Sequence, residues 1–131
     1  MTAPEIRGEK VEIYGYKAWI VKKADLTVDE EGLHVELAVY VVVRRPEDER
    51  GCYVYVIRGG GERTYDWFTG LSVAEMYREV KGQIDALHAM VREKIAAFNA
   101  LKELLEKEGI SVTATCEGYY KSIEDVAKEL Q

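Results

Sequence analysis

A run of apolar residues at helical spacing between residues 72 and 108 constrains the fold of this chain more than any other feature. Its members recur at steps of three, four or seven residues, as on one face of an α-helix: Tyr77, Val80, Ile84, Leu87, Val91, Phe98, Leu101 and Leu105. Ser72 and Glu75 form a Ser-x-x-Glu capping box before the run, and Gly109 supplies a stop after it. The pattern predicts one long helix, or two helices in succession, over residues 72–108.

One unbroken helix of this length would exceed the width of a compact domain. At ~1.5 Å per residue it would be roughly 55 Å long, whereas a compact chain of 131 residues is roughly 36 Å across. Either the segment breaks near Gly82 or Asn99, or it stays whole and projects beyond the rest of the fold. A projecting apolar stripe would be covered by a second copy, although a helix that faces its own core explains the stripe equally well. The candidate dimer-interface residues are Tyr77, Val80, Ile84, Leu87 and Val91.

Residues 9–68 have the composition and alternation of β-strands. The segment from Val11 to Val21 is rich in β-branched and aromatic residues, and Gly15 at its centre predicts a strand that bends there. Asp-Glu-Glu-Gly at 29–32 is a turn, and a clearly alternating strand follows it. One face of that strand carries Leu33, Val35, Leu37, Val39, Val41 and Val43. A charged loop at 46–51 then separates it from a strand at 52–58, and such short connections favour an antiparallel meander.

The segment after Gly109 predicts two smaller elements. Residues 110–116 are rich in β-branched side chains and predict one more strand. Ser122 resembles the cap of a short helix that holds Val126, Ala127 and Leu130. We therefore expect residues 1–131 to form a single α+β domain, in which a meander of four to six strands is covered on one face by the long helix or helix pair.

Three consecutive glycines, Gly59 to Gly61, lie between Arg58 and Arg63. Glycine accepts the positive φ angles of hairpin turns, so the stretch predicts a hairpin. Trp67 and Phe68 then become anchors that pack the start of the helix onto the sheet, with Phe68 the more buried. A glycine-rich loop flanked by arginines would also suit a clamp over a flexible ligand.

The sheet face turned away from the helix carries the functional prediction. Aromatic rings on an open sheet stack the bases of single-stranded nucleic acids, and cations at the margin contact phosphates. The candidate nucleic-acid-binding residues are Tyr14, Tyr16, Tyr40, Arg44, Tyr53, Tyr55, Arg58, Arg63, Tyr65 and Trp67. Each tyrosine is also explained as an ordinary strand residue with its hydroxyl in water, and the net charge of -6 opposes binding to phosphates.

The sequence contains no catalytic or metal-binding signature. His34 and His88 have no nucleophile beside them, and Cys52 and Cys116 lie in no metal-ligand spacing. We therefore predict neither an enzyme, nor a cofactor, nor a metal site. The cysteines are either two buried side chains or a disulfide. The longest apolar run, near 37–43, is too short to span a bilayer and the first residues lack a secretory pattern, which predicts a cytoplasmic protein.

The organisation of most of the chain resembles one family of proteins. A strand-rich first half with aromatics and arginines, a long heptad-like helix, and many charges with few side-chain amides resemble the ThermoDBP-type single-strand-binding proteins of hyperthermophilic archaea. The resemblance rests on no short motif. It implies single-stranded DNA or RNA bound without strong sequence preference, on an oligomer assembled through helices.

Two functions therefore remain open from the sequence. The first is sequence-tolerant binding of single-stranded nucleic acid. The second is a non-catalytic oligomeric interaction or assembly module, of viral or mobile-element origin, that acts through its long helix.

Overall fold

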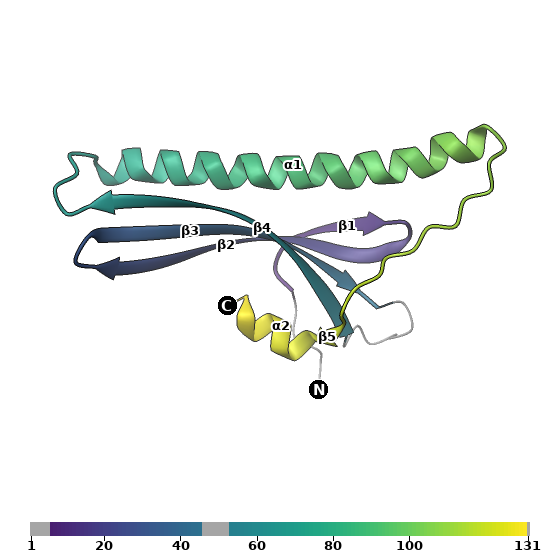
Figure 1. Cartoon of the computed structure of the whole chain (residues 1–131), viewed down its shortest axis with the longest axis horizontal. Helices are drawn as coiled ribbons and strands as arrows, with labels where there is room; N and C mark the ends of the chain where they lie inside the picture. Colours follow the sequence, from purple (N-terminus) through teal and green to yellow (C-terminus); the bar gives the residue numbers. More distant parts are fainter. Residues whose placement is uncertain (1–5, 46–52, 131) are drawn as a thin grey trace.

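The computed structural model describes the backbone of residues 6–45 and 53–130, and the side chains of residues 6–45 and 60–130. The elements are β1 (Glu9–Ile13), β2 (Tyr16–Asp29), β3 (Gly32–Arg44), β4 (Tyr53–Asp66), α1 (Val73–Lys107), β5 (Lys121–Ser122) and α2 (Ile123–Glu129). The strands form one antiparallel sheet in the order β1-β2-β3-β4-β5. α1 runs along one face of the sheet and α2 lies on the other (Figure 1). These observations confirm the α+β class and the antiparallel meander. The predicted loop at 46–51 and Cys52 lie outside the described residues.

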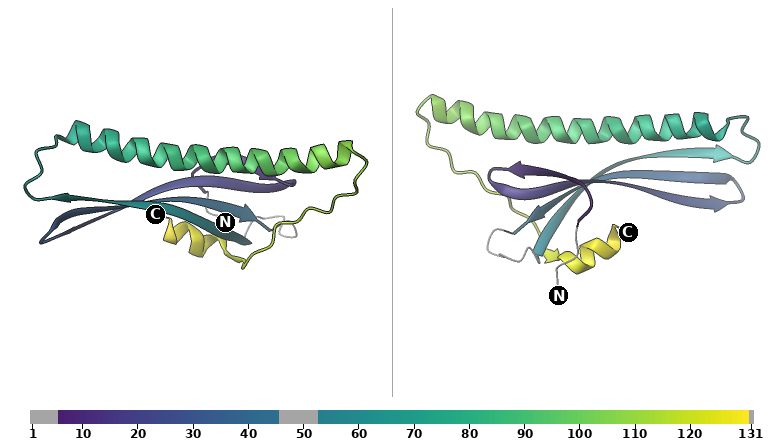
Figure 2. Two further views of the ribbon diagram at one scale, coloured as in Figure 1. Left: turned by 45° about the horizontal axis from the view of Figure 1, so that its top comes forward. Right: turned by 180° about the vertical axis from the view of Figure 1, so that it is seen from behind.

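α1 is a single helix of 35 residues, so the segment does not break. Ser72 caps its start, where the serine hydroxyl accepts a hydrogen bond from the backbone N–H of Glu75 at 3.2 Å. Gly109, at a φ of 75°, follows its end. Asn99, a candidate break point, instead fixes the helix to the β1–β2 turn. Its Oδ1 accepts from the N–H of Tyr14 at 3.0 Å, and its Nδ2 donates to the carbonyl of Glu12 at 2.8 Å. The last turns of α1 extend past the sheet (Figures 1 and 2).

The segment predicted as one bent strand at Val11–Val21 is a hairpin. Tyr14 and Gly15 both have positive φ angles, 51° and 84°, and they form the two-residue loop between β1 and β2. Two successive positive φ angles are the signature of the tight hairpin turn whose twist matches that of the sheet. Gly15 therefore reverses the chain rather than bending it.

The three glycines predicted as a hairpin lie inside β4. Gly59, Gly60 and Gly61 pair with Val39, Ala38 and Leu37 of β3. A Cβ on Gly60 would lie only 2.5 Å from the carbonyl oxygen of Leu37, and a Cβ on Gly61 would clash with Nε2 of Gln83 on α1. The glycines thus allow close approach of β3 and of the helix, and the hairpin prediction was wrong.

α1 packs against the sheet through its predicted apolar stripe. Near the β1–β2 turn, Ile84, Leu87, Val91 and Ile95 join a cluster with residues of β1, β2 and β3. At the opposite end, Met76, Val80 and Ile84 pack with Val35, Leu37 and Tyr65. Four of the five predicted interface residues, all except Tyr77, therefore pack on the chain's own sheet. On the other face, Ile123, Val126 and Ala127 of α2 cover Val21 and Val42.

Two further expectations differ from the structure. Residues 110–116, predicted as a strand, form no ladder and lead from the end of α1 back towards β5 (Figure 1). Their β-branched side chains favour an extended backbone, but a strand also needs a neighbouring edge to pair with. Trp67 and Phe68 do not anchor the helix, because their exposed fractions are 62% and 96%.

The two glycines Gly60 and Gly82 should respond oppositely to alanine. Gly60→Ala should lower the free energy of unfolding by about 1–3 kcal/mol, because its Cβ overlaps the backbone of Leu37. Gly82→Ala should raise it by about 0.5–1 kcal/mol, because Gly82 lies inside α1 with open space around it. Guanidinium denaturation followed by circular dichroism measures both. Equal effects of the two variants would contradict the close approach at Gly60.

Candidate functional site

The aromatic residues predicted to bind nucleic acid do not form one open surface in the described part of the chain. Tyr14 lies in the β1–β2 turn and Tyr16 begins β2; both are half-buried and pack against the cluster beneath α1. Tyr40 does lie on the face away from α1, as expected, but it is half-buried in the cluster that α2 covers. Trp67 follows the far end of β4, where its indole N–H donates to the carbonyl of Asp29 at 2.9 Å.

Two other predicted residues make contacts within the chain. The hydroxyl of Tyr65 donates to Oε2 of Glu79 at 2.7 Å, and the guanidinium of Arg63 donates to the same oxygen at 2.9 Å. Arg63 also lies over the ring of Tyr65, 5.9 Å from its centroid. Burial, followed by the contact with Glu79, raises the pKa of Tyr65 above that of an ordinary tyrosine. Both side chains therefore join β4 to α1.

The remaining predicted residues lie near the other end of β4. Arg44 is half-buried at the end of β3. The side chains of Tyr53, Tyr55 and Arg58 lie outside the described residues. Their backbones show the register, in which Tyr55 pairs with Val43 and Arg58 pairs with Tyr40.

The outer edge of β4 is unpaired over most of its length in the described sheet. β5 pairs only with Tyr53 and Val54, so within the described residues no strand borders β4 from Tyr55 to Asp66. Alternate residues of an antiparallel edge strand direct their N–H and C=O groups outward, where another strand can pair with them. This stretch, called the open β4 edge below, is a ready acceptor for an extended chain.

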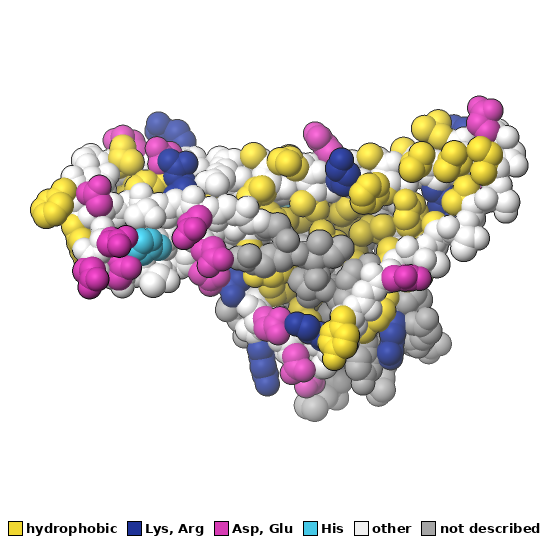
Figure 3. Space-filling view, in the orientation of Figure 1, with side chains coloured by type: hydrophobic (Ala, Val, Ile, Leu, Met, Phe, Trp, Pro, Cys, Tyr) yellow, Lys and Arg dark blue, Asp and Glu magenta, His cyan; other side chains and the backbone are white. Residues whose placement is uncertain are grey.

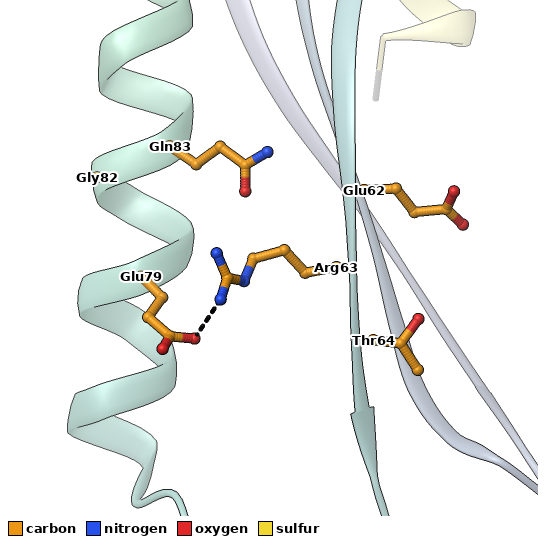
Figure 4. Close-up of a pocket in the computed structure, with 6 residues that line it drawn as sticks. All are labelled: Glu62, Arg63, Thr64, Glu79, Gly82 and Gln83. Carbon is orange, nitrogen blue, oxygen red and sulfur yellow. Dashed lines mark hydrogen bonds and ion pairs between the residues drawn. The ribbon is translucent and has the colours of Figure 1, made fainter.

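A groove of about 540 Å³ lies between this edge and α1. It is lined by Glu62, Arg63, Thr64, Glu79, Gly82 and Gln83. Arg63 and Gln83 reach into the space between strand and helix, whereas Glu62 and Thr64 project from the other face of β4 (Figure 4). The side-chain oxygen of Gln83 is buried and accepts no hydrogen bond from the described residues. The groove thus contains an acceptor that lacks a donor.

The flank of α1 on the same side as the groove becomes apolar towards the end of the helix. Glu79 and Gln83 line the groove, and exposed apolar residues continue from them at steps of three, four and seven. This apolar flank consists of Ala86, Met90, Ala97, Leu101 and Leu104. Met90, Leu101 and Leu104 have exposed fractions of 64%, 53% and 59%. Hydrophobic side chains follow the middle and right-hand part of α1 in Figure 3.

A cluster of charged residues joins α1 to β1. The guanidinium of Arg92 donates to the carboxylate of Glu9 at 2.6 Å and approaches Nδ1 of His88 at 3.4 Å, while Nε2 of His88 lies 3.1 Å from Glu9. Burial lowers the pKa of His88; the charges of Arg92 and Lys22 act in the same direction, and those of Glu9 and Asp85 oppose it. The hydrogen bond from Arg92 lowers the pKa of Glu9. A neutral His88 can donate from Nε2 to Glu9 and accept at Nδ1 from Arg92.

No known protein family, curated protein or solved structure matches the chain. The resemblance to the ThermoDBP-type proteins therefore stays a prediction. Across residues 6–45 and 53–130, no helix has the length and hydropathy needed to cross a membrane. Among the described side chains, those of residues 6–45 and 60–130, no three carboxylate, imidazole or thiol groups gather closely enough to hold a metal ion.

His88 should make the stability of the protein sensitive to mild acid. Its pKa in the folded chain lies below the value of about 6.5 expected when unfolded, so the unfolded chain takes up the proton first. The free energy of unfolding should therefore fall as the pH drops below about 6.5, by at most about 1.4 kcal/mol per pH unit. Glu9, with its lowered pKa, adds a further loss below about pH 4.3.

Denaturation at a series of pH values measures this effect. His88→Gln, which keeps a donor for Glu9, should flatten the profile between pH 5 and 6.5. An unchanged slope in His88→Gln would contradict the assignment.

Proposed function

We propose that this chain is a non-catalytic assembly module that forms a homodimer through the apolar flank of α1. The observation that carries the proposal is the apolar flank, whose residues Met90, Leu101 and Leu104 are more than half exposed. Contiguous exposed apolar surface on a soluble protein marks an interaction site. The stripe on the inner side of α1 is already used by the chain's own sheet, so the flank is available for a partner.

A second copy suits this surface because both ends of α1 are apolar. Phe68 and Val73, at the start of the helix, have exposed fractions of 96% and 79%. Phe98 and Leu101, towards its end, have exposed fractions of 44% and 53%. When two such helices lie antiparallel about a two-fold axis, the start of each meets the later half of the other. A single two-fold rotation therefore covers apolar residues at both ends of the helix.

Binding of single-stranded nucleic acid remains a prediction with less support. Its basis was an open aromatic sheet face, but Tyr40 is packed under α2 and Arg63 is paired with Glu79. The net charge of -6 also opposes a phosphate ligand. The assembly proposal requires neither an open sheet face nor a basic surface.

Charge introduced into the apolar flank should dissociate the dimer. Met90→Glu and Leu101→Glu should each weaken self-association by roughly tenfold or more, because a carboxylate would be buried without a partner. Ala96→Glu is the matched control, since the exposed Ala96 lies one turn after Arg92, which faces β1. Sedimentation equilibrium measures the association constants, and circular dichroism checks that each variant is folded.

Wild-type protein that stays monomeric at high concentration would refute the assembly proposal. Fluorescence titration with labelled single-stranded DNA, single-stranded RNA and duplex DNA separates the two functions. Salt-sensitive binding of single strands by a monomer would support the nucleic-acid function instead.

A further inference from the structure

We propose that two copies of the chain pair through their open β4 edges, antiparallel and centred on Gly60, so that the sheet of one continues into the sheet of the other. This inference rests on the proposed function, because it takes a second copy as the partner. It adds the surface and the register of the pairing.

The open β4 edge is symmetric about its central glycine. It begins at Tyr55, just after the residues that pair with β5, and extends to Asp66. Gly60 lies at its middle, and in a ladder centred there Gly60 faces its own counterpart while Gly59 faces Gly61 of the second copy. Because Gly59 to Gly61 carry no side chains, β4 itself contributes no side chain at the centre of the ladder, either between the β4 strands of the two copies or between these strands and the helices above them.

The charges of β4 favour this register over a neighbouring one. With Gly60 at the centre, position 58, an arginine in the sequence, falls opposite Glu62 of the second copy. The two-fold axis repeats this pairing of opposite charges. The nearest other register is shifted by two residues, because opposite side chains must lie on the same face of the sheet; it would place position 58 opposite Gly60 or Thr64 of the second copy and would lose the pairing of opposite charges.

Gln83 lies beside the proposed axis. Its carboxamide lies against Gly61, next to the proposed axis, and its buried oxygen accepts no hydrogen bond from the described residues. Buried acceptors in proteins almost always have a donor. This oxygen is already out of reach of solvent in a single copy, so two Gln83 carboxamides can satisfy each other across the axis only after the side chains turn towards it.

The same operation also covers part of the apolar flank. An axis perpendicular to the sheet keeps both α1 helices on one face and makes them antiparallel neighbours. Ala86 and Met90 follow Gln83 on the groove side of α1, so each would face the early part of the other helix. One arrangement therefore pairs the open β4 edge and covers the nearer part of the apolar flank.

Distances between spin labels test the register. Labels are attached at Thr64→Cys or Asp66→Cys, both exposed positions that leave Glu62 in place, after Cys52→Ser and Cys116→Ser in the full chain. With ~3.4 Å per residue along each strand, the backbone separation between copies should be about 27 Å at position 64 and about 41 Å at position 66. Pulsed electron resonance should show this increase of about 14 Å. Equal distances at the two positions, or a decrease, would overturn the proposed pairing.

Reversal of charge provides a second test that does not depend on labels. Glu62→Arg should weaken the dimer by roughly tenfold, because it places two arginines opposite each other. The double variant with Arg58→Glu should restore the association. Thr64→Arg is the matched control, since it adds the same charge opposite Val56 of the second copy and should have little effect. Failure of the double variant to restore association, in a protein still folded by circular dichroism, would overturn the register.

The outcomes distinguish this inference from the proposed function. A protein that remains monomeric refutes both. A dimer that is dissociated by Leu101→Glu, but shows neither the label distances nor the charge rescue, refutes only the pairing through β4. A folded monomer that binds an extended peptide of another protein at this edge would likewise refute the pairing of two copies.

Discussion

The structure depends on one unbroken helix that is longer than the sheet it covers. At ~1.5 Å per residue, the 35 residues of α1 span about 52 Å, and a twisted sheet cannot follow a straight rod over that distance. α1 therefore packs in two places, around Ile95 near the β1–β2 turn and around Val80 at the other end. Between these places the carboxamide of Gln83 lies against Gly61, where a larger residue would displace that side chain.

The rest of the fold compensates for what α1 leaves uncovered. Its later half is held by polar contacts, with Asn99 on the β1–β2 turn and Arg92 on Glu9. The opposite face of the sheet would expose Val21 and Val42, and the chain returns after the helix to cover them with α2. The irregular segment at 110–116 is the connection that this return requires, which explains why its β-branched residues form no ladder.

Structural features that are set by interactions within a few residues could be predicted from the sequence. Features that depend on residues distant in the sequence could not. Ser72 and Gly109 mark the ends of α1 through local hydrogen bonds and local φ angles, and alternation placed Val35 and Leu37 on the face that meets the helix. The sequence predictions for the two groups of glycines are wrong. The sequence favours a bent strand at Gly15 and a turn at Gly59–Gly61, because only the pairing with β3 and the contact with Gln83 reveal that the triple glycine lies in a strand. Tyr40 was placed on the correct face, but the sequence of β3 cannot show that α2 covers it.

The glycines of β4 do not by themselves argue for a partner, because Gly60 is already required by its contact with the carbonyl of Leu37. Glycine also weakens an isolated strand, and an edge of weak β-propensity is one way for a protein to avoid unwanted pairing. The order of the charges bears on these two views. An edge that only avoids pairing needs no particular order among its charges, whereas antiparallel pairing of two copies about Gly60 places position 58, an arginine, opposite Glu62 on both sides of the axis. The proposed pairing of two copies rests on this order and not on the glycine content of β4.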